Sequence, residues 1–465
     1  MFNALFTKTE EYTKLAQALG SPGACALFGI PGSGRAMVYA ALAKALDKPL
    51  CIVTPGEAEA TRFAGDLNAL GVAAAVFPAR DYVLRPIEGT GREYEYRRLA
   101  VLGDLVGGRL QAVCVPDEGL TQYTTPRADF CANTRSLRPG DTLPRAELTA
   151  LLYGAGYTRR DQVDGPGQFS IRGDIADIYA PDMKQPARME FWGDEIDSMG
   201  FFDTDTQRRA ENIESFRVLP ACESLVDPSR AGSIAKELLS RAARAERREQ
   251  PELARRLRRD AELISTGAPL PWSDRYLPEL YSEYSTALDF IAPDAIVYID
   301  APNRCAEKAK DISDSLADDL KILREGAFPV AETGDYLLPW KDACEKIADF
   351  AVVMADAFSA GRYPLSPRSV LDTNVRQLPS YGGSAETVLA DVQRYLENEF
   401  RVVVFASDDR RADVLAAMLE RNGIPPLRGF PNGALPPEGR ATVAVGALSA
   451  GLEAPEAHLA VLTDT

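Results

Sequence analysis

One loop of the sequence has the glycine spacing of a phosphate-binding loop. It lies between a predicted strand, Ala24–Phe28, and a predicted helix, Arg35–Leu46, and reads Gly29-Ile30-Pro31-Gly32-Ser33-Gly34-Arg35-Ala36. A working GxxxxGK[ST] loop holds phosphates with backbone N–H groups, reaches the terminal phosphates with its lysine and holds Mg²⁺ with its hydroxyl. Here Arg35 replaces the lysine, and the Ala36 methyl group cannot coordinate magnesium.

The loop is therefore predicted to be degenerate. Its candidate residues are Gly29, Gly32, Gly34, Arg35 and Ala36. We expect no hydrolysis and no bound cofactor in this chain. Weak anion binding by the backbone and a working NTPase remain as alternatives.

Few other residues offer catalytic chemistry. Asp117 and Glu118 follow a predicted strand, Gln111–Val115, as a metal-binding pair would, but adjacent acids in a loop are usually solvated. His458 is the only histidine, which excludes histidine-rich metal sites. The 7 cysteines form no CxxC pair and indicate reduced thiols rather than a disulfide or zinc framework. We expect no catalytic residue and no metal site.

Composition places the chain among globular multidomain proteins. Its 465 residues are 46% hydrophobic and 26% charged, with a net charge of −16 that argues against a general nucleic-acid coat. No apolar run reaches the ~18 residues of a membrane span, and the first twelve residues lack a signal-peptide core. These features predict a cytoplasmic protein.

The spacing of apolar runs predicts an α/β multidomain chain. Residues 1–126 alternate strands and helices, as in a parallel sheet of the P-loop type, and 216–370 resume that texture. Between them, 127–215 carries short strands and turn signals typical of a small antiparallel α+β insert. Residues 375–465 form a third compact α/β domain. Because Thr465 directly follows a predicted strand, we expect a piece of a longer protein.

A basic run, Arg241–Arg259, offers a second kind of surface. Its arginines alternate with glutamates, as on a solvated helix with i,i+4 pairs. The alternative is a surface that contacts a DNA backbone or an acidic domain. The candidates for nucleic-acid contact are Arg241, Arg244, Arg248 and Arg255.

Two stretches of the insert, 169–181 and 188–198, are distinctive. They resemble the damage-handling protein UvrB and, more closely, the N-terminal UvrB-like module of the bacterial transcription-repair coupling factor (Mfd). Supporting segments are 76–78, 97–99, 202–208 and 218–221. The resemblance is strong over 20–225 and more diffuse afterwards. UvrB itself has an intact phosphate loop and a long DNA-clamping hairpin, for which Pro78–Arg92 is too short.

The resemblance implies a non-catalytic platform. In the family, the full protein recognises RNA polymerase stalled at a lesion, displaces it as an ATP-dependent translocase on duplex DNA, and recruits UvrA through the antiparallel domain. The matching UvrA-contact positions are Arg172, Arg188 and Trp192. ATP and Mg²⁺ are expected only in motor domains outside this sequence, and no membrane partner is implied.

Alternative interpretations remain open at this stage. Trp192 could belong to the core, with both arginines paired to Asp174, Asp177 or Glu190 inside the domain. The whole chain could instead be an active UvrB-type P-loop ATPase or DNA helicase, or a plain DNA-binding module.

Overall fold

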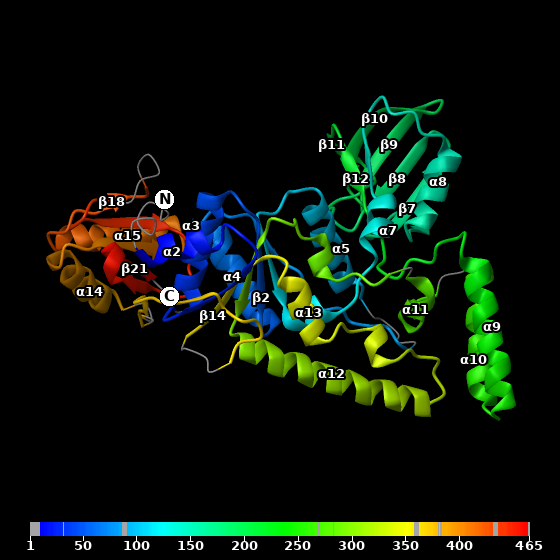
Figure 1. The fold of residues 1–465 in the computed structure, drawn as a ribbon. Coiled ribbons are helices and arrows are strands. Elements are labelled where there is room, and N and C mark those ends of the chain that lie inside the picture. The colour runs from blue at the N-terminus through cyan, green and yellow to red at the C-terminus, as the bar shows by residue number, and fades with distance from the viewer. Residues whose placement is uncertain are drawn as a thin grey trace.

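The computed structural model describes residues 10–30, 32–85, 91–266, 270–281, 283–357, 362–379, 381, 384–430 and 436–463. Pro31, Thr465 and the middle of the segment Pro78–Arg92 lie outside these residues. The described chain forms three α/β units, with the insert and the C-terminal unit on opposite sides of the first unit (Figure 1). No helix in the described part of the chain is long and apolar enough to cross a bilayer.

The first unit is a seven-stranded sheet whose neighbouring strands are all parallel. In sheet order its strands are β15 (Ser369–Asp372), β1 (Gly23–Phe28), β14 (Ala351–Asp356), β13 (Ile296–Asp300), β2 (Leu50–Thr54), β4 (Ala112–Pro116) and β3 (Ala74–Val76). The chain leaves this sheet after β4 and returns to its centre, because β13 and β14 lie between β1 and β2. This confirms the predicted parallel sheet interrupted by an insert.

Helices cover both faces of this sheet, as the continuous burial of its central strands requires. One face packs on α2 (Glu10–Ala18), α3 (Gly32–Leu46) and α4 (Glu57–Ala69). The other packs on α5 (Glu93–Val106), α6 (Asp117–Thr121), α7 (Arg127–Ala132), α12 (Pro302–Glu325) and α13 (Trp340–Ile347). Alternate residues of each strand enter the two cores, as a pleated strand dictates.

The insert is a six-stranded sheet that projects from the first unit. Its strands, in sheet order, are β11 (Arg209–Asn212), β10 (Glu195–Phe202), β9 (Ala187–Trp192), β8 (Ile175–Tyr179), β7 (Gln168–Arg172) and β6 (Thr158–Arg159). All neighbours are antiparallel except β6 and β7. Helix α8 (Arg145–Gly154) packs Leu148 and Leu152 against the core face of this sheet. Gly173 and Gly193 lie at positive φ, where a glycine is favoured, in the short turns of the β7–β8 and β9–β10 hairpins.

A short ribbon, β5 (Arg135–Leu137) paired with β12 (Phe216–Val218), completes the core of the insert. Phe216, Val218 and Ala221 are buried in that core, although they follow the boundary predicted at residue 215. Glu223 and Ser224 then connect the insert to the first unit, because they accept hydrogen bonds from Arg98 and Arg80 of that unit.

We expect the excised fragment 127–223 to unfold cooperatively and at a higher temperature than 127–215. The shorter fragment lacks β12 and leaves its β5 partner unpaired, with Leu137 uncovered. Circular dichroism melts of both fragments check this. Equal melting temperatures would show that β12 adds nothing to the insert.

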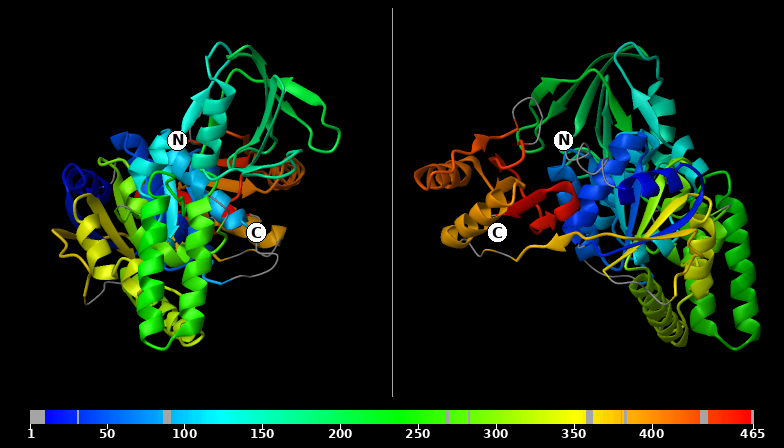
Figure 2. Two further views of the ribbon diagram at one scale, coloured as in Figure 1. Left: turned by 90° about the vertical axis from the view of Figure 1, so that its right-hand side faces the viewer. Right: turned by 60° about the vertical axis from the view of Figure 1, so that its left-hand side comes forward.

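A helical hairpin follows the insert (Figure 2). Helices α9 (Ala231–Arg247) and α10 (Pro251–Thr266) bury one apolar stripe each, with α11 (Leu277–Leu280) and part of α12 in the same core. The stripes repeat at helical spacing, for example Leu238, Ala242 and Ala245. The opposite faces of the hairpin are exposed and carry most of its charges.

The C-terminal unit is a second mixed sheet. Its strands, in sheet order, are β16 (Arg376–Gln377), β20 (Leu452–Ala454), β21 (Leu459–Thr463), β17 (Arg401–Ala406), β19 (Ala441–Val445) and β18 (Leu427–Arg428), with helices α14 (Ala385–Glu397) and α15 (Asp409–Arg421). It packs on the first unit through a shared core that includes Phe405 and Leu448. Buried Asp66 on α4 also accepts hydrogen bonds from the Ser449 N–H and Oγ, both at 2.7 Å.

Candidate partner-binding surface

The degenerate phosphate loop packs against the segment that follows β15 and does not form an open phosphate site. The chain passes from β1 through Gly29, at φ +79°, and is already helical at Gly32, so Gly32 and Gly34 lie inside α3 rather than in an open loop. A Cβ atom on Gly29 would collide with the backbone oxygen of Thr373, which follows β15. Gly29 therefore serves the close approach of two segments.

Arg35 points to a carboxylate, not to an open phosphate site. Its guanidinium is buried and forms an ion pair with Asp300, the last residue of β13. Burial raises the pKa of Asp300 to about 6, although the charge of Arg35 opposes that shift. Ala36 is also fully buried and packs in the core, so no hydroxyl faces this loop from its position.

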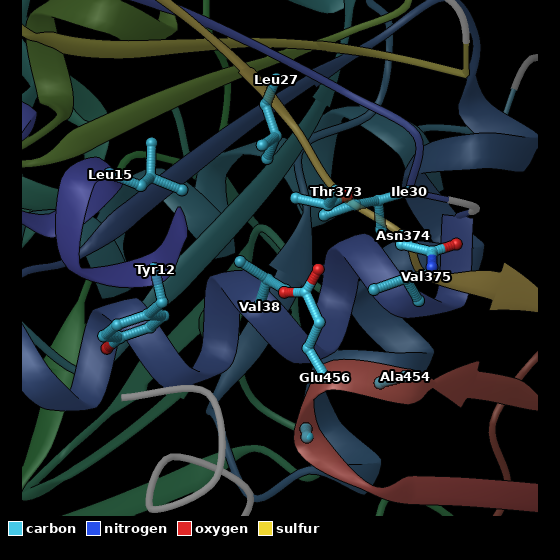
Figure 3. A pocket seen from close by; sticks show the side chains of 11 residues that line it. Tyr12, Leu15, Leu27, Ile30, Val38, Thr373, Asn374, Val375, Ala454 and Glu456 are labelled. Atoms are coloured by element: carbon cyan, nitrogen blue, oxygen red, sulfur yellow. The ribbon is translucent and has the colours of Figure 1, made fainter. Parts of the chain in front are cut away.

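The cavity beside the loop is too small for a nucleotide. It has a volume of about 40 Å³, enough for a few water molecules. Figure 3 shows its mainly apolar lining, with Tyr12 and Leu15 from α2, Val38 from α3 and Glu456 from the C-terminal unit. It belongs to the junction between the two α/β units.

The expectation that both acids after β4 are solvated is wrong for Asp117. This residue begins α6 and is buried, because α6 packs against α12. Burial raises the pKa of Asp117 to about 7, and Oδ2 has no hydrogen-bond partner among the described residues. In the part of the chain that the structure describes, no cluster of His, Cys, Asp and Glu side chains is arranged to hold a metal ion.

Asp117→Asn should raise stability at pH 8 and change it little at pH 4. A buried acid whose folded pKa exceeds its unfolded value stabilises the protein when protonated, and that contribution is lost as the pH rises toward about 7. We expect a gain of about 2 kcal/mol at pH 8, measured by urea unfolding at both pH values. Exposed Asp311→Asn on α12 is the control. A gain of the same size at pH 4 would contradict the assignment.

Three of the four candidate arginines of the basic run form ion pairs, one of them with α11. Arg241 pairs with Glu279, Arg244 with Glu237 and Arg255 with Glu252. Arg248, at the C-terminal end of α9, has no ion pair among the described residues. The pairs of Arg244 and Arg255 are those of a solvated helical face, whereas the less exposed pair of Arg241 joins α9 to α11. Nucleic-acid contact by these four arginines stays a prediction.

The outer face of the insert brings the three other predicted residues onto one sheet. Phe169, Ile178 and Met189 fill the core face of β7, β8 and β9, so strand alternation turns Arg172, Arg188 and Trp192 to the opposite face. Cross-strand register places Asp177 of β8 directly opposite Arg188 of β9.

Asp177 is the centre of a hydrogen-bonded network on this face. Its carboxylate, 1% exposed, accepts from Arg188 Nε at 2.7 Å and Nη2 at 3.0 Å, and from Arg172 Nη2 at 2.9 Å. The hydrogen bond to Asp177 raises the pKa of Arg188. Arg188 also lies over the buried Phe202 ring, with its guanidinium carbon 4.4 Å from the ring centroid.

Exposure separates the three predicted contact residues. Trp192 is 83% exposed at the end of β9, so it is not a core residue. The Arg172 side chain is 47% exposed, whereas that of Arg188 is only 15% exposed. The alternative that both arginines pair inside the domain is correct for their contacts with Asp177, and Arg172 still reaches solvent.

The insert is homologous to a known interaction module. Residues 136–223 match the family model of the UvrB interaction domain, and this range includes β12. The chain as a whole is homologous to the N-terminal part of transcription-repair-coupling factors.

Two relatives illustrate the extent of this likeness. The transcription-repair-coupling factor of Bacillus subtilis (strain 168) is 25% identical over 449 residues, covering 94% of this chain and 38% of that protein. The one from Staphylococcus aureus (strain USA300) is 23% identical over 477 residues, covering 100% of this chain and 40% of that protein. The chain thus spans at most about two fifths of the length of these relatives. A solved structure of S. tokodaii Xpd4 aligns with 94% of this chain at 10% identity and a TM-score of 0.24.

Proposed function

We propose that this chain is a non-catalytic platform that recruits the repair protein UvrA through the outer face of its insert. In the whole protein of which it forms a part, this platform would serve a translocase that displaces stalled RNA polymerase from duplex DNA. The observation that carries the proposal is an exposed tryptophan, Trp192, on the same sheet face as Arg172 within a region that matches the UvrB interaction domain.

The chemistry of this surface suits a protein partner. An exposed indole supplies a large apolar contact, and arginine and tryptophan are enriched among residues that dominate binding energy. A guanidinium fork pairs with a carboxylate through two parallel hydrogen bonds, so we expect an acidic side chain on UvrA opposite Arg172.

Titration of UvrA against the intact chain tests the proposal. We expect saturable binding that weakens in Trp192→Ala. The matched control is Ile322→Ala, which truncates another exposed apolar side chain, on α12 rather than on the insert. Absence of binding, or equal weakening by both variants, would reject this face as the recruitment surface.

The chain should not hydrolyse ATP, and Arg35→Lys with Ala36→Thr should not create turnover. Asp300 would pair with a lysine at position 35 as it pairs with Arg35. Position 36 lies within the buried start of α3, where a threonine hydroxyl would not face an open site. Phosphate release, measured with and without DNA, checks both proteins. Turnover by the unmodified chain would favour the active UvrB-type ATPase instead.

A further inference from the structure

Positive charge in this chain is concentrated on one part of the helical hairpin. Residues 241–259 hold eight arginines, three glutamates and no lysine, a net charge of +5 in a chain whose total is −16. Both helices contribute, because these residues end α9 and begin α10. The hairpin points away from the insert, so its tip lies far from the face proposed for UvrA (Figure 1).

Three of these arginines are held by contacts outside the hairpin. They are Arg241, which pairs with Glu279, Arg256, whose guanidinium carbon lies 3.7 Å from the centroid of the Phe328 ring, and Arg259, whose guanidinium carbon lies 5.5 Å from that of Trp272. Phe328 and Trp272 belong to the core that the hairpin shares with its neighbours. These three side chains therefore serve the packing of the hairpin.

The other five arginines face solvent. Three of them have side chains that are 51–73% exposed and form ion pairs inside the hairpin: Arg244 with Glu237 at 2.8 Å, Arg255 with Glu252 at 2.6 Å, and Arg258 with Glu246 at 2.6 Å. The remaining two, Arg247 and Arg248, are exposed at the tip and have no ion pair among the described residues. Because an exposed ion pair is weak, all five guanidinium groups can turn to another anion.

The chemistry of this surface suits phosphate groups better than a protein. Protein interfaces centre on aromatic and apolar side chains, whereas the backbone of a nucleic acid is bound by cations and hydrogen-bond donors. Among the described residues 241–259, no large apolar side chain is exposed. Leu239, which is 49% exposed, precedes Arg247 by about two helical turns. A guanidinium fork also matches two phosphate oxygens at once.

We propose that the five solvent-facing arginines of the hairpin bind the phosphate backbone of duplex DNA, with Arg247 and Arg248 as the principal contacts. Such a surface has no preference for base sequence, because it contacts phosphates only. Of the four arginines predicted for nucleic-acid contact, Arg244, Arg248 and Arg255 keep that role, and Arg241 belongs to the packing instead. This site goes beyond the recruitment of UvrA and does not depend on it.

Fluorescence anisotropy of a labelled duplex of about 20 base pairs, titrated with the intact chain, tests the proposal. Affinity should fall by about 10- to 500-fold between about 50 and about 200 mM salt, as expected when counterions are released from two to five phosphates. Arg247→Gln with Arg248→Gln should weaken binding by about 10-fold or more at the lower salt concentration and reduce the log–log salt slope by about 2. Undetectable binding by the wild type, or binding that this double variant leaves unchanged, would overturn the proposal.

Arg410→Gln with Arg411→Gln is the matched control. These two arginines are also adjacent and exposed, but they lie on α15 in the C-terminal unit. The control loses the same charge and should bind the duplex within about 2-fold of the wild type, because salt screens charges on a distant unit. Both double variants should melt like the wild type, since exposed arginines contribute little to stability. Equal weakening by both would show a general effect of net charge and would overturn the proposal.

Arg241→Gln tests the division between packing and contact arginines. We expect a lower melting temperature but duplex affinity within about 3-fold of the wild type, because Glu279 already holds this guanidinium and no phosphate contact is lost. Affinity lost as fully as in Arg247→Gln with Arg248→Gln, in protein that is still folded, would overturn this division.

Competition with poly-L-glutamate distinguishes DNA from an acidic protein. At equal concentrations of negative charge, unlabelled duplex should displace the labelled duplex far more effectively than the polypeptide does. Equal displacement by both competitors would show that the hairpin binds any acidic chain, and would overturn DNA as its ligand.

Discussion

Glu223→Ala should destabilise the folded chain by about 3–5 kcal/mol, the range observed when one partner of a buried ion pair is removed. Glu223 and Arg98 are both fully buried, and they join the end of the insert to α5. The Glu223 carboxylate accepts from Arg98 Nε at 2.6 Å and from Thr124 Oγ1 at 2.6 Å. Urea unfolding measures the loss.

The cost arises from the charges that remain. Arg80 lies 3.6 Å from the same carboxylate, so alanine at position 223 leaves two buried guanidinium groups, of which Arg98 retains only the Pro78 backbone oxygen as an acceptor. Burial raises the pKa of Glu223, but Arg98 and Arg80 outweigh burial and leave that pKa lowered. The carboxylate therefore stabilises the fold at neutral pH, and this contribution is lost only as the pH falls through the lowered pKa.

An exposed ion pair supplies the control for this experiment. Glu252→Ala removes the partner of Arg255 on the surface of α10 and should leave the stability almost unchanged, because water and salt screen an exposed pair. A loss below about 1 kcal/mol in Glu223→Ala would mean that water reaches the network and that the insert is not anchored through it.

Local patterns in the sequence predict the elements of this chain well. The strands Gln168–Arg172 and Ile175–Tyr179 lie on either side of the turn at Gly173, in agreement with the short strands and turn signals predicted for 127–215. The helix Glu93–Val106 likewise follows from its apolar repeat. Each of these patterns spans only a few neighbouring residues, so no contact with a distant segment is needed to predict the element.

Contacts between distant segments are not readable in this way. The partner of Arg35 is 265 residues away, and only the return of β13 to the centre of the first sheet brings Asp300 to the loop. The residue types of the loop show that it is degenerate, but only the tertiary structure shows that Arg35 pairs with an internal carboxylate.

On the outer face of the insert, too, local patterns predict which way a side chain faces, but not which residues it contacts. Strand alternation predicts that Arg172 is turned away from Phe169, and the structure agrees. The sharing of Asp177 by both arginines depends on the register of β8 against β9, which periodicity does not determine. Burial of Arg188 against Phe202 depends in addition on the bulged pairing of β9 with β10.

Arg172→Ala and Trp192→Ala should each weaken UvrA binding by about 2 kcal/mol or more, as expected for central arginine and tryptophan contacts. Melting temperatures should stay near that of the wild type, because both side chains are exposed and Trp192 packs little against the insert. Arg188→Ala differs: it removes two of the three arginine hydrogen bonds to the buried Asp177 carboxylate and uncovers the Phe202 ring, so its melting temperature should fall.

Calorimetric titration paired with thermal melts distinguishes contact from folding for each variant. A contact residue shows lost affinity at unchanged melting temperature, whereas a scaffold residue shows a lowered melting temperature. Unchanged affinity in both Arg172→Ala and Trp192→Ala would remove the outer face of the insert as the recruitment surface. Lost affinity together with a collapsed melt in Trp192→Ala would instead mean that the indole packs within the protein, contrary to its 83% exposure.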